Sequence, residues 1–241
     1  MKINASYYSA IGGREKNEDA VSILEGRASV LYMVADGLGG HRGGDLAAQT
    51  AVSILSGELG QKPVSVKAMQ QAIETANREI LSDRRCLSMK TTIAALWLDE
   101  ENAVAATVGD TRIYQFRKGE ILFQSKDHSV AYLSALSGKE NMQRIREDKR
   151  RNQLTRALGG ESEVKADVFT LNLIPEDVFL ICSDGFWEDV LEKEMQEDLK
   201  NSCNAEDWLV FMKKRIENRK RIEKDNHSAI AVFLEKAGNR G

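Results

Sequence analysis

Four aspartates stand at the ends of four apolar runs, and this arrangement constrains the fold more than any other feature. Asp36 follows residues 29–35, Asp110 follows 103–108, Asp184 follows 178–182, and Asp225 precedes 228–234. Short apolar runs rich in β-branched residues are typical of buried strands, so we expect the four carboxylates to meet at one rim of a sheet structure. Crowded carboxylates repel one another and resist ionisation unless cations neutralise them. The pattern therefore predicts an oxygen-ligand metal site, which suits Mg²⁺ or Mn²⁺ better than zinc.

The remaining apolar patterns predict a mixed architecture. Residues 91–98 form another candidate strand, and two short apolar runs flank Lys118-Gly119, which predicts a hairpin and hence antiparallel pairing. Helical spacing occurs within residues 47–55, 69–80 and 208–216. Asn204 is a candidate N-cap for the last helix. Strands separated by helical pairs suggest helices packed outside a β-sandwich.

A single aspartate at the end of a strand commonly does no more than cap a turn. That plain interpretation is weaker for Asp36 and Asp184, because each begins an Asp-Gly pair directly after a long apolar run. Glycine permits backbone conformations that can aim a carbonyl at the ion held by the preceding carboxylate.

The glycine-rich segment at 36–48, DGLGGHRGGDLAA, has two interpretations. A phosphate-binding nucleotide loop would need the spacing GxxxxGK[ST] or GxGxxG, and neither is present. Nucleotide binding is therefore disfavoured. The preferred interpretation is a tight loop that leaves room for metal, water and phosphate.

Length and charge narrow the class of protein. A chain of 241 residues that is 42% hydrophobic is long enough for one large core and short for two domains. The formal net charge of -3 gives no basic field for nucleic acid or an anionic membrane. Three cysteines without CxxC spacing favour neither disulfides nor zinc and fit a reducing compartment. No signal-peptide-like or membrane-spanning apolar stretch is present, so we expect a cytoplasmic protein.

One stretch stands apart in composition. Residues 138–151 hold six basic and three acidic side chains, a local balance of +3. A solvated helix face is the plainer interpretation. The functional alternative is a mobile flap beside an anionic substrate.

Eight sequence blocks in order resemble the metal-dependent protein Ser/Thr phosphatases of the 2C type, in their short bacterial form. The blocks cover nearly the whole chain: REKNED at 14–19, VADGLGGHRGG at 34–44, TT at 91–92, VGDTRIY at 108–114, KDHS at 126–129, NQLTRALG at 152–159, CSDGFW at 182–187 and DNHSAI at 225–230. An isolated Asp-Gly pair means little, whereas eight blocks in this order are specific.

The resemblance implies an α+β fold, namely a four-layer α-β-β-α sandwich of two antiparallel sheets flanked by antiparallel helix pairs. It also implies one phosphatase catalytic domain over residues 1–241, with a flap subdomain at about 129–151. The sandwich agrees with the independent interpretation of the apolar patterns.

The resemblance further assigns metal ligands by position. Asp36 is expected to bridge two Mn²⁺ or Mg²⁺ ions. The carbonyl of Gly37 and the side chain of Glu18 serve the second ion directly or through water, whereas Asp184 and Asp225 serve the first. Asp110 together with Asp184 offers a weaker third site.

Two further residues are matched to roles in catalysis. Arg14 corresponds to the phosphate-binding arginine of the family, although pairing with Glu15 or Glu18 on the surface is the alternative. His41 is a candidate general acid. In animal relatives a histidine directly follows the first Asp-Gly pair, but Leu38 takes that place here, so His41 either donates a proton or braces the glycine loop.

The implied activity is hydrolysis of phosphoserine and phosphothreonine in proteins by a metal-activated water, opposing a bacterial Ser/Thr kinase. Expected partners are phosphorylated proteins, including that kinase, and the expected oligomeric state is a monomer. A catalytically dead fold that binds phosphoproteins is a rival, but it would be expected to have lost Asp36, Asp184 or Asp225. A phosphatase for small phosphate esters or nucleotides remains a second rival, because such a centre recognises phosphate and not the attached alcohol.

Three other reactive side chains have plainer interpretations. His227 flanks the last aspartate, His128 is expected to order the loop that enters the flap, and Cys182 is expected to be buried filler.

Overall fold

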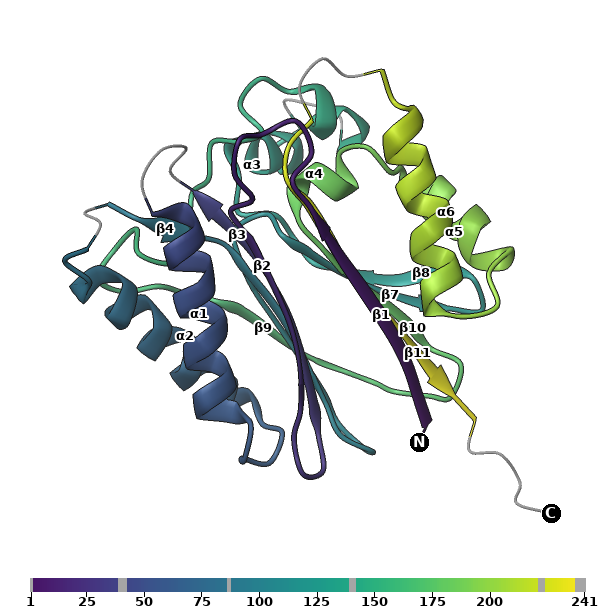
Figure 1. Cartoon of the computed structure of the whole chain (residues 1–241), viewed down its shortest axis with the longest axis horizontal. Coiled ribbons are helices and arrows are strands. Elements are labelled where there is room, and N and C mark those ends of the chain that lie inside the picture. The colour runs from purple at the N-terminus through teal and green to yellow at the C-terminus, as the bar shows by residue number, and fades with distance from the viewer. Residues whose placement is uncertain (1, 39–42, 86–87, 139–141, 221–223, 237–241) are drawn as a thin grey trace.

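The computed structural model describes residues 2–38, 43–85, 88–138, 142–220 and 224–236. Within them, two antiparallel sheets pack face to face (Figure 1). The first sheet has the order β1 (Lys2–Ala10), β11 (His227–Glu235), β10 (Val178–Cys182), β7 (Arg112–Arg117) and β8 (Glu120–Gln124). The second has the order β2 (Asp19–Glu25), β3 (Val30–Leu38), β5 (Ile93–Leu98), β6 (Ala103–Val108) and β9 (Asp167–Leu171), with the short β4 (Lys90–Thr91) paired to β3.

Helices cover the outer face of each sheet. The second sheet is covered by α1 (Gly44–Leu59) and α2 (Val66–Ser82), and the first by α5 (Glu192–Lys200) and α6 (Ala205–Asn218) (Figure 1). The one-turn helix α4 (Asp184–Trp187) directly follows β10. The predicted α-β-β-α sandwich is therefore confirmed.

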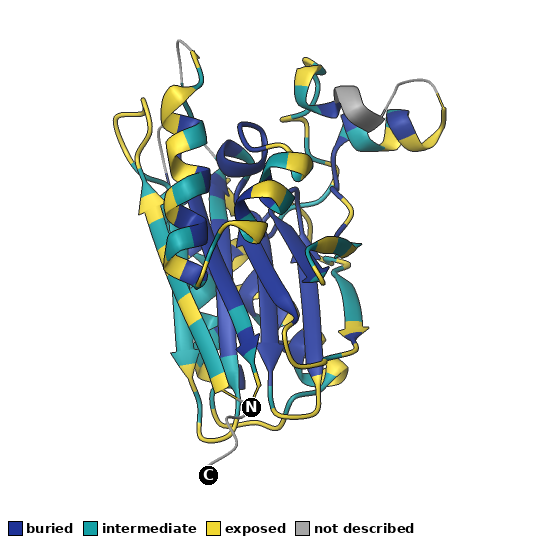
Figure 2. Cartoon of the chain, turned by 90° about the vertical axis from the view of Figure 1, so that its right-hand side faces the viewer, coloured by how far each residue is buried: buried dark blue, intermediate teal, exposed yellow. Residues whose placement is uncertain are grey.

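The central strands β3, β5, β6 and β10 are largely apolar because both of their faces are buried. Successive side chains of a strand point to opposite faces. In β3, Leu31 and Met33 pack beneath α1 and α2, whereas Tyr32 and Val34 lie between the sheets. Figure 2 shows the resulting contrast between the buried strands and the more exposed helices and turns.

Two local predictions are confirmed and one is corrected. Lys118 and Gly119 both have positive φ, as a tight hairpin turn between β7 and β8 requires. The side chain of Asn204 caps α6 by accepting the Asp207 N–H. The predicted strand over 91–98 is instead interrupted at Thr92, because the backbone N–H and side chain of that residue bind Asp36.

The flap segment, defined as residues 129–151, contains α3 (Val130–Leu136) and a 3₁₀ helix, η1 (Met142–Glu147). Residues 139–141 and the side chains of 142–144 lie outside the described part of the chain. The two short helices contact each other. They lie near α4 at the end of the sandwich that is opposite the N-terminus (Figure 1).

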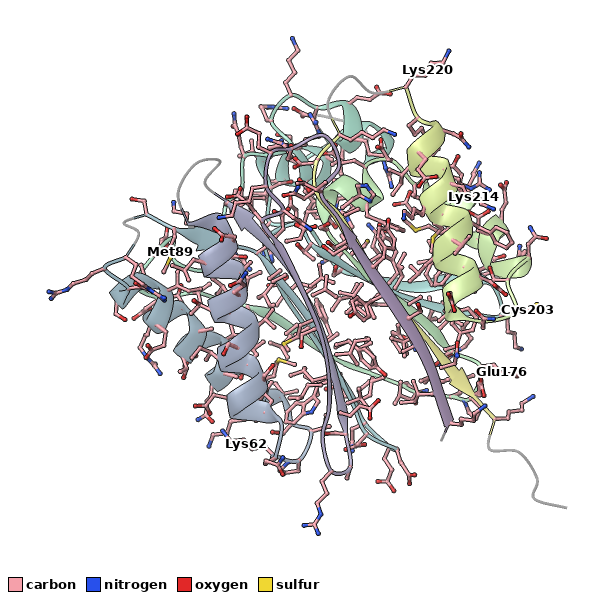
Figure 3. The ribbon with its side chains drawn as sticks, in the orientation of Figure 1. Lys62, Met89, Glu176, Cys203, Lys214 and Lys220 are labelled. Carbon is pink, nitrogen blue, oxygen red and sulfur yellow. The ribbon has the colours of Figure 1, made fainter. Side chains whose placement is uncertain are left out.

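The cysteines agree with a structural interpretation where they are described. Cys182 is fully buried in β10, and burial raises the pKa of its thiol. Cys203 is exposed, beside the start of α6 (Figure 3). Neither forms a disulfide. Among the described helices, none is long and apolar enough to cross a membrane.

Candidate active site

A cavity of about 610 Å³ gathers the predicted functional residues. Its lining includes all six predicted metal ligands and the predicted phosphate ligand, namely Arg14, Glu18, Asp36, Gly37, Asp110, Asp184 and Asp225. His41 falls outside the described residues.

The topology explains why these residues meet. Asp36 lies near the end of β3, Asp184 follows β10 as the first residue of α4, and Asp225 precedes β11. Asp110 lies in the turn from β6 to β7, and Glu18 directly precedes β2. Strand ends from both sheets thus bring five acidic side chains to one cavity.

Thr91 and Thr92 fix the backbone of Asp36. The Thr92 hydroxyl accepts the Asp36 N–H at 2.9 Å, and the Thr92 N–H donates to the Asp36 carbonyl at 2.8 Å. The Thr91 hydroxyl donates to the same carbonyl at 2.9 Å. Both threonine side chains are buried, so the Thr-Thr block braces the first metal motif.

The glycine of each Asp-Gly pair is needed for space. A Cβ on Gly37 would lie 2.3 Å from the backbone of Gly44, and one on Gly185 would lie 2.2 Å from the Asn226 carbonyl oxygen. Neither glycine has a positive φ. At both positions glycine is required by the close approach of other backbone atoms and not by a left-handed conformation.

The carboxylates in the cavity disfavour one another's ionisation. Burial raises the pKa of Asp36 and Asp110 well above the usual value, and the charge of Asp184 raises both further. Burial and the charge of Asp225 raise the pKa of Asp184 to about 7. Divalent cations relieve such repulsion, so the donor set fits oxygen-liganded metal ions.

Arg14 binds Asp225. Its Nη2 donates to Asp225 Oδ2 at 2.6 Å, and Asp225 Oδ1 accepts the Asn226 N–H at 2.8 Å. This partner differs from the Glu15 and Glu18 considered from sequence. Among the described residues, no group of three acidic, histidine or cysteine side chains is arranged to hold a metal ion as these side chains stand.

Sequence reasoning missed Asp19. Its pKa is raised to about 6, chiefly by burial, although hydroxyls of Ser228 and Ser183 donate to its Oδ2 at 2.6 and 2.9 Å. Its buried Oδ1 has no hydrogen-bond partner among the described residues. Such an orphaned oxygen, directly opposite Asp36 in the β2–β3 register, fits a ligand from outside the chain. The sequence feature that could have revealed Asp19 is that Ser183 and Ser228 each lie within a predicted metal-binding motif.

Asn226 was also missed. Its side-chain oxygen accepts the Glu18 N–H at 2.8 Å, and its amide donates to the carbonyls of Ile11 and Lys16 at 2.8 and 3.0 Å. One amide therefore ties the loop carrying Arg14 and Glu18 to the start of β11. The signal was its position beside Asp225.

Of the four basic side chains of the flap segment that the structure describes, three are paired. Arg146 donates to the Trp187 carbonyl at 2.9 Å and to Glu192 at 2.7 Å. Arg150 pairs with Asp148 at 2.7 Å, and Arg151 pairs with Glu188 at 2.5 Å. Lys149 is exposed. The basic excess is thus only in part available to a substrate.

A second cavity of about 530 Å³ adjoins the first, since Leu38, Asn152 and Leu154 line both. It extends along residues 155–165, and none of the acidic side chains of the first cavity lines it. A molecule held at the carboxylates therefore has room to continue in this direction.

Comparison with known proteins agrees with this geometry. A family model described as protein phosphatase 2C matches residues 8–225. The serine/threonine phosphatase stp of Listeria monocytogenes serotype 4b is 33% identical over 199 residues, which are 78% of this chain and 79% of that protein.

Solved structures are similar as well. The Staphylococcus aureus serine/threonine phosphatase Stp1 has a TM-score of 0.88 at 25% identity, over 98% of this chain and 96% of that chain. The Mycobacterium smegmatis Ser-Thr phosphatase MsPP, solved in complex with cacodylate, has a TM-score of 0.82 at 27% identity, over 95% and 97% of the two chains.

Proposed function

The chain belongs to the protein phosphatase 2C family and is a protein serine/threonine phosphatase, and on that premise we propose that it is metal-dependent. Two Mn²⁺ or Mg²⁺ ions, held at the acidic cavity, serve hydrolysis of phosphoserine and phosphothreonine in proteins. The observation that carries this proposal is that several carboxylates are buried together in one cavity and have raised pKa values. Such carboxylates repel one another unless cations are bound. When bound, the ions supply an activated water as nucleophile and neutralise charge on the phosphate.

The proposed ligands follow the order of the motifs. Asp36 would be shared by the two core ions, Asp184 and Asp225 would hold the first, and the Gly37 carbonyl and Glu18 would hold the second. Threonine hydroxyls and the close approach of Gly37 to α1 hold the bridging residue rigidly. Rigid placement of ligands favours one productive ion geometry.

Asp110, with Asp184, completes a weaker third site. Both side chains line the same cavity, and the charge of Asp184 raises the pKa of Asp110. A cation held by both carboxylates would relieve that repulsion.

Arg14 binds the substrate phosphate in this proposal. Its guanidinium lies at the cavity and is about half exposed, and its planar fork can donate to two phosphate oxygens. Neutralisation of Asp225 by a bound cation would free Arg14 from its present partner. Binding of metal and binding of phosphate therefore favour each other.

His41 remains the proposed general acid. A phosphoserine or phosphothreonine leaves as an alkoxide, which is a strong base and benefits from a proton as the bond breaks. The alternative role is to brace the glycine loop.

Protein substrates suit the shape of the site. The second cavity continues from the first and offers room for polypeptide beside the phosphorylated residue. We further place the chain in the cytoplasm as a monomeric catalytic domain with a flap at 129–151, opposing a Ser/Thr kinase that is itself among its substrates. The free cysteines Cys182 and Cys203 support a reducing compartment.

One experiment tests the proposal and its rivals. Hydrolysis of a phosphothreonine peptide and of p-nitrophenyl phosphate is measured with Mn²⁺, with Mg²⁺ and with excess EDTA. Turnover of both substrates is expected only with metal, and Asp36→Asn should reduce it to background while the fold persists. Turnover that survives EDTA contradicts metal dependence, and hydrolysis of small esters alone favours a small-molecule phosphatase.

A further inference from the structure

His128 binds both polar main-chain groups of Gly109. The Gly109 N–H donates to His128 Nδ1 at 3.0 Å, and the His128 N–H donates to the Gly109 carbonyl at 2.9 Å. The histidine lies at the entrance to the flap segment, with 5% of its surface exposed. Because Asp110 directly follows Gly109, His128 holds the turn that carries this carboxylate.

The turn needs such a support. Gly109 has a φ of 100°, and a Cβ there would lie 2.5 Å from Thr92 Cγ2, so only glycine fits. Glycine has the greatest backbone freedom of any residue and no side chain of its own to anchor it. The orientation of this peptide therefore depends on its hydrogen bonds.

Asp167 and Arg156 fix the orientation of the His128 imidazole ring. An Nδ1 that accepts the Gly109 N–H leaves the ring proton on Nε2, and Asp167 Oδ2 lies 3.3 Å from Nε2. Arg156 Nη1 donates to Asp167 Oδ1 at 2.8 Å, which orients the carboxylate. Arg156 Nη1 also lies 3.2 Å from His128 Nε2, but a guanidinium has no acceptor, so the Nε2 proton is directed to Asp167. This resembles the way in which outer carboxylates fix the tautomer and orientation of histidines around functional sites.

A second contact fixes the other side of the same residue. The indole N–H of Trp187 donates to the Asp110 carbonyl at 2.9 Å. Trp187 closes α4, the helix that begins with Asp184. Asp110 is therefore held between His128, which binds the preceding peptide, and the helix that carries its candidate co-ligand.

We propose that His128 is a positioning residue for Asp110, acting through the Gly109 peptide. The proposal rests on the proposed function, in which Asp110 and Asp184 hold a weaker third cation. His128 makes no hydrogen bond to Asp36 or Asp225, which are proposed to hold the core ions. Loss of His128 should thus resemble loss of Asp110 and leave the core ions in place.

Two substitutions separate the contacts of the ring. In His128→Asn the side-chain oxygen can take the place of Nδ1 and accept the Gly109 N–H, whereas in His128→Gln the polar group lies nearer the place of Nε2. Calorimetric Mn²⁺ titration should show the weakest class of sites weakened about tenfold in His128→Gln, as in Asp110→Asn. His128→Asn should remain close to wild type.

A double-mutant cycle decides the route of action. If His128 acts through Asp110, His128→Gln combined with Asp110→Asn should bind Mn²⁺ and turn over p-nitrophenyl phosphate no worse than Asp110→Asn alone. The proposal is overturned if the losses of the two single variants multiply in the double variant, or if His128→Gln binds Mn²⁺ as wild type does. It is also overturned if His128→Gln and His128→Asn lose Mn²⁺ binding equally and both have a lowered Tm. Absence of metal-dependent hydrolysis in the wild type would instead contradict the proposed function, and the binding comparison would still test His128.

Discussion

Asp19 and Asp36 lie directly opposite each other across the antiparallel pair of β2 and β3. Both carboxyl groups are buried, and the charge of Asp19 contributes to the raised pKa of Asp36. Two serine hydroxyls bind only Oδ2 of Asp19, and its Oδ1 has no partner among the described residues. Asp19 therefore adds negative charge behind the proposed bridging ligand.

From this pairing we predict that Asp19→Asn weakens Mn²⁺ binding about tenfold, the usual size of an outer-ligand effect. The side-chain volume and an acceptor for the two serines are kept, so the fold should persist. Isothermal titration with Mn²⁺ measures the affinity, and kcat at saturating Mn²⁺ shows whether the chemistry is retained. Unchanged Mn²⁺ affinity would remove Asp19 from the functional site.

Metal binding should stabilise the fold more at higher pH. The pKa of Asp184 rises from 3.8 to about 7 on folding without metal, so the folded state binds more protons than the unfolded state between these values. The free energy of unfolding of the metal-free protein therefore falls as pH rises through that window. Mn²⁺ replaces those protons and removes the penalty.

With Mn²⁺ at a hundred times its Kd, stabilisation is about 2.7 kcal/mol, or roughly 5–10 °C in Tm for a chain of this length. We expect this Tm increase at pH 7.5 and a smaller one at pH 5.5, measured by differential scanning calorimetry. Asp36→Asn is the matched control and should show little increase at either pH. An increase that is larger at pH 5.5 would contradict the predicted linkage.

The sequence predicts the acidic rim because an aspartate at the end of a buried strand needs no knowledge of distant contacts. Apolar runs at 29–35 and 178–182 place Asp36 and Asp184 at strand ends, and both lie in one cavity. The helices were similarly visible from spacing. These features depend on local periodicity alone.

Other site features depend on register and on contacts far apart in sequence. Asp19 faces Asp36 only because β2 and β3 pair in one particular register. Arg14 meets Asp225 across 211 residues, and nothing near Arg14 distinguishes Asp225 from the adjacent Glu15. The pairing of Arg146 with Glu192 likewise requires the flap segment to lie against α5, which composition does not show.

Two roles of the flap segment can be tested by separate substitutions: attachment of the segment to the rest of the domain, and attraction of acidic substrates. Arg146 fastens the segment to Trp187 and Glu192, so Arg146→Ala loses charge-assisted hydrogen bonds worth about 1.5–3 kcal/mol. We expect trypsin to cleave within the segment faster than in wild type. We also expect the substitution to raise the KM for a phosphopeptide more than the KM for p-nitrophenyl phosphate.

Lys149→Ala is the matched control, because it removes the same charge from an exposed position of the same segment. It should leave trypsin cleavage elsewhere in the segment unchanged and raise the KM of acidic phosphopeptides only. Equal cleavage rates in Arg146→Ala and wild type would show that the arginine does not fasten the segment.

His41 can be tested by the chemistry of the leaving group. A nitrophenolate departs without protonation, whereas a threonine alkoxide does not. If His41 is a general acid, His41→Ala should lower kcat for the phosphothreonine peptide by about 10²-fold or more and change kcat for p-nitrophenyl phosphate little. Parallel losses on both substrates would assign His41 to bracing the glycine loop.

Arg14 should affect phosphate and metal in opposite directions. Arg14→Ala removes hydrogen bonds to phosphate worth about 1.5–3 kcal/mol each, so KM should rise roughly 10- to 100-fold for both substrates. The same change frees Asp225 from its 2.6 Å partner and removes a positive charge from the cavity, so Mn²⁺ should bind more tightly. Lys16→Ala is the control, because it removes one charge from the same loop and leaves the Arg14–Asp225 pair intact. Weaker Mn²⁺ binding in Arg14→Ala would mean that Arg14 orients Asp225 toward the ion and does not compete with it.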